Sequence, residues 1–196
     1  IDLIKLLEPF LKTQDKTFFT LAHALMAPTK ELTSDGGRYF TEEAGILAAG
    51  LLKHLYMKGE GDLFGAFARI LSKNETDLKK YFKEAVAEYP LGEMVPNFLG
   101  SYSEADSRTF TSLQSTARQA LIWASFDKFG DILSSEPSDA ADPLGPKTDI
   151  YIKLSMSDIH DFPTIVRLIF ATLIFIVEEK KGVGERLMII DEAYQV

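Results

Sequence analysis

The residues best placed to do chemistry are two adjacent carboxylates near the end of the chain, Asp191 and Glu192. They directly follow the apolar run 187–190, which predicts a short buried strand. Such a strand fixes the side chains at its carboxyl end at the edge of an α/β sheet, where ligands of these sheets bind. In this interpretation Asp191 orients the water shell of Mg²⁺, and Glu192 polarises the water that attacks a nucleotide phosphate. The alternative is that both acids only end a strand at the surface.

The loop that should cradle the phosphates has no match in the sequence. No Gly-x-x-x-x-Gly-Lys-Ser/Thr motif occurs. Around Lys147 the first glycine is absent, and Pro146 removes an amide donor where the loop needs donors. We therefore interpret Lys147 as a linker residue. If the chain comes from an ATPase, we expect the nucleotide loop to precede Ile1, and we expect residues 1–196 alone not to bind ATP normally.

Other residues of chemical interest are better explained by structure. A zinc site needs three or four convergent donors, and the three histidines, His23, His54 and His160, have no partner at such spacing. Trp123 lies in an apolar helical run, which predicts a core residue rather than a platform for stacking bases. The chain contains no cysteine, which excludes disulfides, thiolate metal sites and a cysteine nucleophile.

The charge balance argues against a general nucleic-acid-binding role. Lys and Arg number 21 against 29 Asp and Glu, a net charge of −8, so no global basic field neutralises phosphates. The lysines in residues 73–83 alternate with acids, which is typical of a solvated helix face. Acidic ligands are also disfavoured by repulsion, unless a local basic patch intervenes.

The elements that must position these residues begin with a helical bundle. Hydrophobic residues make up 46% of the chain, enough to build a core. Up to residue 134 they recur at helical spacing. The expected helices cover residues 3–11, 16–26, 42–57, 62–71, 76–87 and 103–132, the last as one helix or two broken near Ser107. Residues 29–38 are expected to form a loop. The most apolar stretch, 168–177, is too short to cross a bilayer, which takes roughly 20 residues.

The composition changes after residue 134. Residues 135–147 are rich in Ser, Asp, Ala and Pro and predict a linker. Beyond it we predict a strand at 149–154, a helix from Ser157 to about Lys181 with Pro163 at its start, and a strand at 186–190. This order makes a βαβ unit with parallel strands. We thus predict a mainly α chain, with a helical bundle at 1–134, a linker at 135–147 and a βαβ segment at 148–196.

Several segments also resemble one family. Residues 149–158, 162–170 and 188–193 are similar to the stretch leading into the Walker B strand of the type IV secretion and conjugation coupling proteins (TraG/TraD family). Residues 37–44 resemble the aromatic-x-x-x-Ala entry to the family's all-alpha domain, and residues 109–117 resemble the helix returning from it. The resemblance covers most of the chain, and its specific motifs lie in the final fifty residues.

The resemblance implies an all-alpha domain followed by a βαβ piece of a RecA-like nucleotide-binding domain. Family members are hexameric, membrane-anchored ATPases that translocate DNA, so the parent would use ATP and Mg²⁺ at the cytoplasmic face of the bacterial inner membrane. By this analogy Asp191 is the metal-side acid, acting through Mg²⁺-bound water, and Glu192 is the catalytic acid. The implied partners are relaxase or effector proteins and other secretion-system subunits, with DNA a weak ligand of the bundle because of its acidic charge.

Two alternatives stay open. The bundle could be a helical insertion of another P-loop DNA motor, or a non-enzymatic adaptor that binds proteins and in which Asp191 and Glu192 merely end a strand. The chain begins with Ile rather than Met, and its last segment resembles one edge of a larger domain. We therefore expect a piece of a longer protein, without ATPase activity when isolated.

Overall fold

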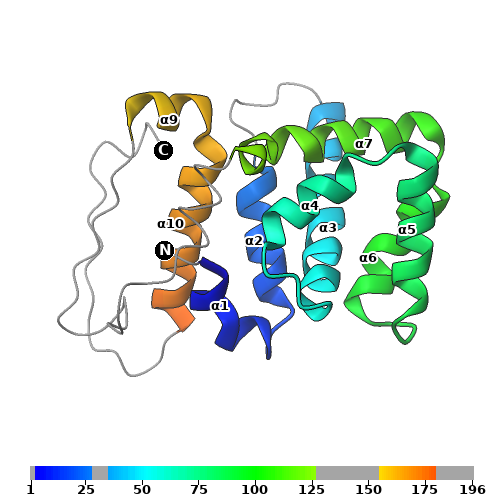
Figure 1. Cartoon of the computed structure of the whole chain (residues 1–196), viewed down its shortest axis with the longest axis horizontal. Helices are drawn as coiled ribbons and strands as arrows, with labels where there is room; N and C mark the ends of the chain where they lie inside the picture. Colours follow the sequence, from blue (N-terminus) through cyan, green and yellow to red (C-terminus); the bar gives the residue numbers. More distant parts are fainter. Residues whose placement is uncertain (1–2, 28–34, 127–154, 180–196) are drawn as a thin grey trace.

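The computed structural model describes residues 3–27, 35–126 and 155–179, and these ranges are almost entirely helical. The helices are α1 (Leu3–Leu11), α2 (Lys16–Met26), α3 (Asp35–Met57), α4 (Leu63–Leu71), α5 (Glu75–Ala87), α6 (Met94–Glu104), α7 (Ser107–Ala120), the 3₁₀ helix η1 (Ile122–Ser125), α9 (Met156–Asp161) and α10 (Pro163–Glu179) (Figure 1). The prediction of a mainly α chain is confirmed. No strand occurs in the described ranges. The linker, both predicted strands, Lys147, Asp191 and Glu192 lie outside them.

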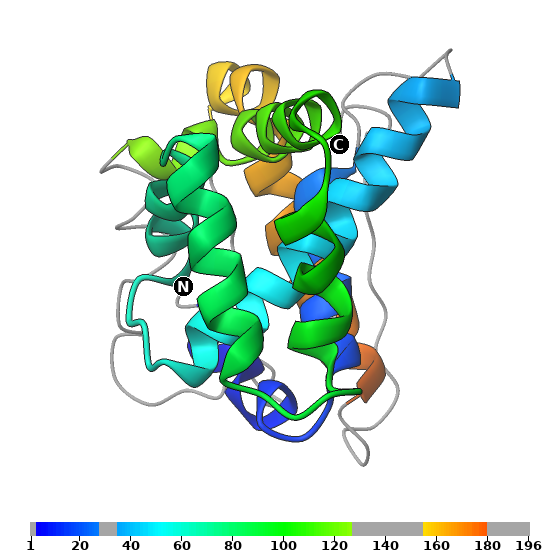
Figure 2. The ribbon, with the colours of Figure 1, turned by 90° about the vertical axis from the view of Figure 1, so that its right-hand side faces the viewer.

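The long helix α3 is the centre of the bundle. It packs against α2, α4, α6 and α7, and for that reason its buried residues lie on several sides: Ala44, Leu47, Ala48, Ala49, Leu51, Leu52 and Leu55. Such a broad apolar stripe is typical of a helix that is buried among several others. The helix α7 crosses the other helices of the bundle (Figure 1), and α5 and α6 lie side by side (Figure 2).

The contact between α3 and α6 is unusually close because α3 carries a glycine there. A methyl group built on Gly50 would lie 2.8 Å from Cβ of Phe98 and 3.2 Å from Cγ of Leu99 on α6. The buried Tyr102, one turn further along α6, places its hydroxyl 2.8 Å from Oε2 and 2.9 Å from the carbonyl oxygen of Glu43 on α3. Burial and this carboxylate raise the pKa of Tyr102. The two helices are therefore joined by close packing and by a buried hydrogen bond.

The first two helices, and the end of the third, lie where the sequence predicted them. The helices at 3–11 and 16–26 have the expected bounds. The predicted end of the third helix at residue 57 is also confirmed. Gly59, just beyond it, has a φ of +75°, a conformation that glycine adopts without steric cost. The Gly59 amide donates to the Tyr56 carbonyl oxygen at 3.0 Å, and the Glu60 amide donates to that of Leu55 at 3.2 Å. These two bonds form a Schellman motif, which satisfies the last carbonyls of the helix.

Two predicted helix boundaries within the bundle are wrong. Residues 35–38, expected in a loop, form the first turn of α3. The two glycines there keep their backbone N–H groups and can join a helix, at an entropic cost of about 0.5–1 kcal/mol each relative to alanine. The helix predicted for 103–132 breaks near Ser107 as one alternative had it, but α7 ends at Ala120 and the 3₁₀ helix η1 follows. The helix α6, which precedes this break, was not predicted.

The predicted helix 157–181 is also corrected, because the structure has two helices there. The short α9 ends at Asp161, and α10 begins at Pro163. A proline pushes the residue before it out of helical geometry, which explains the break at Phe162. None of the described helices has the length and apolarity needed to cross a bilayer.

The helix α10 packs on α1 and α2, although more than 130 residues of the chain separate it from them. The Phe175 ring meets the Phe10 ring edge to face with 5.5 Å between centroids, and Lys16 forms an ion pair with Glu179. Most apolar residues of α10 are buried, among them Ile165, Leu168, Ile169 and Ile176. Residues within the range predicted as the βαβ segment therefore share a hydrophobic core with the first two helices.

Candidate functional site

Asp191 and Glu192, the predicted metal-side and catalytic acids, lie outside the described residues. Within the described ranges no group of three or more His, Asp or Glu side chains could hold a metal ion. The interpretation of the histidines as packing or surface residues agrees with their surroundings. His54 is 2% exposed, with Nδ1 3.1 Å from the Tyr89 hydroxyl, and burial lowers its pKa. His160 is exposed and pairs with Asp161 at 2.9 Å.

The basic residues of α5 are neutralised by carboxylates, as their interleaved pattern predicted. Lys79 Nζ lies 2.8 Å from Glu75 Oε1, and Lys83 Nζ lies 2.9 Å from Glu104 Oε1. Lys80 approaches Glu84 less closely, at 3.9 Å. This face is therefore a network of ion pairs and offers no unpaired row of cations to a phosphate backbone.

A groove of about 450 Å³ lies where α4, α7 and η1 meet, and it is the candidate binding surface. Its lining combines small apolar groups with hydroxyl and amide groups and one cation. The lining residues are Ala68, Ser72, Thr111, Gln114, Ser115, Arg118, Gln119, Leu121, Ile122 and Ser125. This volume is within the range of ligand-binding pockets, about 300–1,000 Å³. A few convergent polar groups beside apolar surface can orient a bound chain by hydrogen bonds.

The side-chain amide of Gln114 holds two walls of the groove together. Its Nε2 donates to the carbonyl oxygens of Leu71 and Lys73, at 2.7 and 2.8 Å. The last carbonyl groups of a helix have no partner within it, so Gln114 satisfies the end of α4 from α7. The Ser72 hydroxyl donates to the Ala68 carbonyl oxygen at 2.9 Å in the same turn. Hydrogen bonds thus fix the backbone at the end of α4, which forms one wall of the groove.

Trp123 supports the other end of the groove from within the core. It is 2% exposed, and its ring centroid lies 5.5 Å from that of Phe64 on α4. Its indole N–H donates to the Ala120 carbonyl oxygen at 2.8 Å, which satisfies the last residue of α7. The neighbouring Ile122 is 56% exposed and lines the groove. The prediction that Trp123 is a core residue is confirmed.

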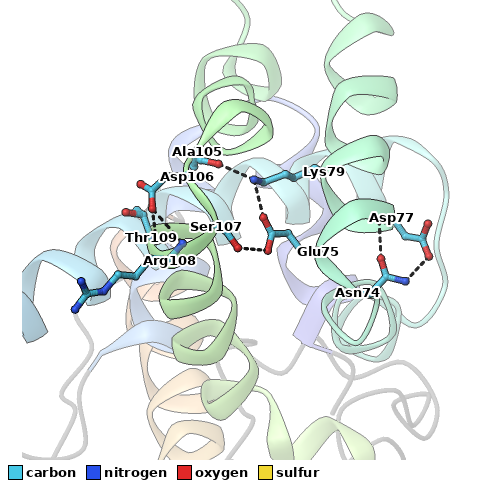
Figure 3. A network of polar contacts seen from close by, with 9 residues as sticks. All are labelled: Asn74, Glu75, Asp77, Lys79, Ala105, Asp106, Ser107, Arg108 and Thr109. Carbon is cyan, nitrogen blue, oxygen red and sulfur yellow. Dashed lines mark hydrogen bonds and ion pairs between the residues drawn. The ribbon is translucent and has the colours of Figure 1, made fainter.

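The opposite end of α7 is attached to α5 by a polar network (Figure 3). Asp106 caps α7 by accepting hydrogen bonds from the amides of Arg108 and Thr109 at 3.0 and 3.1 Å, and the hydrogen bonds with Thr109 lower the pKa of Asp106. The Ser107 hydroxyl donates to Glu75 Oε2 at 2.6 Å, and Lys79 Nζ donates to the Ala105 carbonyl oxygen at 2.6 Å. Both ends of α7 are therefore fixed to neighbouring helices.

The groove also has an unusual charge for this acidic chain. Residues 107–126, which form α7 and η1, contain Arg108 and Arg118 but no Asp or Glu. Arg118 is exposed and lines the groove. The described residues that line the groove therefore carry one positive charge and no negative one, on a chain whose net charge is −8.

The chain is similar in sequence to two known proteins over most of its length, at low identity. It is 23% identical over 175 residues to the type IV secretion system-coupling protein VirD4 of Bartonella quintana (strain Toulouse), a match covering 86% of this chain and 27% of that protein. It is 24% identical over 155 residues to the protein of the same name from Bartonella henselae, covering 76% of this chain and 24% of that protein. The chain is therefore similar to these two type IV secretion coupling proteins over most of its length.

The chain spans about a quarter of the length of these coupling proteins. No protein-family model matches it, and no solved structure matches it. The family resemblance noted in the sequence is confirmed. The groove on α7 was not predicted, although the absence of acids from residues 107–126 is visible in the sequence and could have singled out this helix.

Proposed function

We propose that this chain includes the substrate-receiving helical part of a type IV secretion coupling protein. The observation that carries the proposal is the extent of the similarity to VirD4. A match that covers 86% of the chain includes most of the helical bundle, and not only the C-terminal segment that holds the specific motifs. The helical bundle described here is consistent with the all-alpha domain that the resemblance implies.

The ligand that the bundle receives is a protein, such as a relaxase or an effector, rather than DNA. Neutralising phosphates takes several Lys or Arg side chains on one surface, and the lysines of α5 are paired with carboxylates. The net charge of −8 adds repulsion. Other secretion-system subunits are further partners of the parent protein, which we propose to be hexameric and anchored at the inner membrane.

A direct binding experiment tests this function. The chain is immobilised, and candidate secretion substrates and duplex DNA are passed over it at about 50 and 200 mM salt, a range over which DNA binding by several phosphate contacts falls steeply. We expect binding of a cognate relaxase or effector at both salt concentrations, and weak DNA binding that disappears at the higher one. Tight, salt-resistant DNA binding without protein binding would refute the proposal.

We also propose that Asp191 and Glu192 are the Walker B acids of the whole protein. Asp191 would hold a water of the Mg²⁺ shell, and Glu192 would activate the water that attacks ATP. The test is Glu192→Gln in the full-length protein, which should abolish ATP turnover while ATP binding persists. Unchanged turnover would favour the non-enzymatic adaptor, in which the two acids only end a strand.

A further inference from the structure

The stretch that forms α7 and η1 differs in charge from the rest of the chain. The chain has 29 Asp and Glu among 196 residues, about one in seven, and residues 107–126 have none. Two arginines remain in this stretch, Arg108 near the start of α7 and Arg118 near its end. A helix without acids on an acidic protein creates a local positive potential, and that potential attracts the opposite charge.

No carboxylate is found beside Arg118 within the described ranges. Other basic side chains of the same bundle have one: Lys58 with Glu88 at 2.7 Å, Arg69 with Asp62 at 3.2 Å and Lys83 with Glu104 at 2.9 Å. Arg118 is exposed and lines the groove. A planar guanidinium presents several donors in a fixed geometry that matches a carboxylate.

A second cation lies at the edge of the same groove. Lys73 lies two residues beyond the end of α4, and its carbonyl oxygen accepts a hydrogen bond from Gln114, a lining residue. Its side chain is exposed, and in the described part of the chain no carboxylate pairs with it. Arg118 thus lines the groove and Lys73 lies beside it in the chain, and the described residues that line the groove include no acid.

The remaining lining identifies the kind of ligand. Hydroxyl and amide side chains from Thr111, Ser115 and Gln119 can bond to peptide groups. Ile122 is 56% exposed at the groove and offers apolar contact. Two cations are too few to hold a nucleic-acid backbone in salt, because the affinity for DNA depends on the number of phosphates neutralised. Carboxylates next to apolar residues in an extended peptide match both the charge and the apolar surface.

From these observations we propose that the groove between α4, α7 and η1 binds an extended acidic peptide segment of a protein substrate, with Arg118 pairing with a carboxylate of the peptide and Lys73 contributing a second charge. This inference rests on the proposed function and specifies the chemistry of the segment received. The net charge disfavours acidic ligands unless a local basic patch intervenes. In this proposal Arg118 and Lys73 form that patch.

The test uses labelled peptides of about ten residues with alternating Leu and a polar residue, which is Glu, Gln or Lys. Binding to the full chain is followed by fluorescence anisotropy and by the emission of Trp123, the one tryptophan of the chain, which lies behind the groove. We expect the Glu peptide to bind at least about tenfold more tightly than the Gln peptide, and the Lys peptide to bind most weakly. Equal affinities for the Glu and Gln peptides, or displacement of the Glu peptide by a single-stranded oligonucleotide at lower concentration than by unlabelled Glu peptide, would overturn the proposal.

Variants of the two arginines assign the effect to the groove. Arg118→Gln should remove most of the preference for Glu over Gln, and Arg118→Glu should reverse it in favour of the Lys peptide. Arg108→Gln is the matched control: it makes the same change in charge on the same helix, ten residues or about 15 Å away, where Arg108 points away from the network that fixes α7 (Figure 3). This control should leave the Glu peptide affinity within about twofold. Equal effects of the two variants would overturn the assignment to Arg118, and circular dichroism shows that each variant is folded.

Whole substrates separate this inference from the function on which it rests. If a relaxase or effector binds and Arg118→Glu does not weaken it, the groove proposal fails and the proposed function stands. If no secretion substrate binds but the Glu peptide binds through Arg118, the proposed function fails and the groove chemistry stands. Loss of substrate binding in Arg118→Glu, with binding kept in Arg108→Gln, supports both.

Discussion

The same substitution at two glycines of α3 should change stability in opposite directions. Gly45 and Gly50 both lie inside this helix and both are buried. Alanine is favoured over glycine within a helix by about 1 kcal/mol. A methyl group on Gly45 meets no atom within 4 Å, so Gly45→Ala should gain most of this amount.

Gly50→Ala adds a steric cost that outweighs the gain. Its methyl group would lie 2.8 Å from Cβ of Phe98, an atom attached directly to the backbone of α6. Since Cβ cannot rotate away, α6 itself must move, and overpacking of this kind costs about 1–3 kcal/mol. With the helix-propensity gain subtracted, we expect Gly50→Ala to destabilise the protein by up to about 2 kcal/mol.

Thermal unfolding followed by circular dichroism measures both changes. For a domain of this size, 1 kcal/mol corresponds to about 2–4 °C in the unfolding temperature. Gly45→Ala should raise that temperature by about this amount, and Gly50→Ala should lower it by up to about 8 °C. A rise for both variants would refute the close packing of α3 and α6 described above, and a fall for both would refute the empty space beside Gly45.

Three further changes test individual contacts. Tyr102→Phe removes the hydroxyl that lies 2.8 Å from Glu43 Oε2 and should cost about 1–2 kcal/mol in urea unfolding; an unchanged midpoint would show that the bond adds nothing. Asn74→Ala removes the N-cap of α5, which accepts the Asp77 amide at 2.9 Å, and should cost about 1 kcal/mol, while Asn74→Ser keeps most of the cap. Burial lowers the pKa of His54, so as the pH falls the unfolded state binds a proton at this side chain before the folded state does. Stability should therefore fall as the pH drops below about 6.5. His54→Phe should flatten this pH dependence of stability between pH 5 and 8, and equal slopes in both proteins would contradict the assignment to His54.

Local signals in the sequence were enough for several elements. The helices at 3–11 and 16–26 follow from apolar spacing, and the end of α3 follows from Gly59, whose φ of +75° suits glycine. The break between α9 and α10 follows from Pro163 by the same kind of local rule, although we had predicted one helix there. Each of these features depends on neighbours in sequence and hence can be predicted without the fold.

The features that could not be predicted depend on distant contacts. The helix α6 contains Pro96 and Gly100, both poor helix formers, and it is held by packing on α3 and α5. Its proline is tolerated because it lies in the first turn, where its missing amide is not needed. The groove combines side chains from α4, α7 and η1, so its residues could be listed from the sequence but not brought together.

The packing of α10 on α1 and α2 has a consequence for how the chain folds during synthesis. The sequence separation of Phe10 and Phe175, whose rings are in contact, is 165 residues. At about 5–20 residues per second, the ribosome needs roughly 10–30 s to make that stretch. During this interval α10 has not yet been made, so it cannot cover the faces of α1 and α2 on which it packs in the folded chain. The helices α2 to α7 can already form their shorter-range contacts. Protection from aggregation by chaperones would therefore matter most for the first two helices.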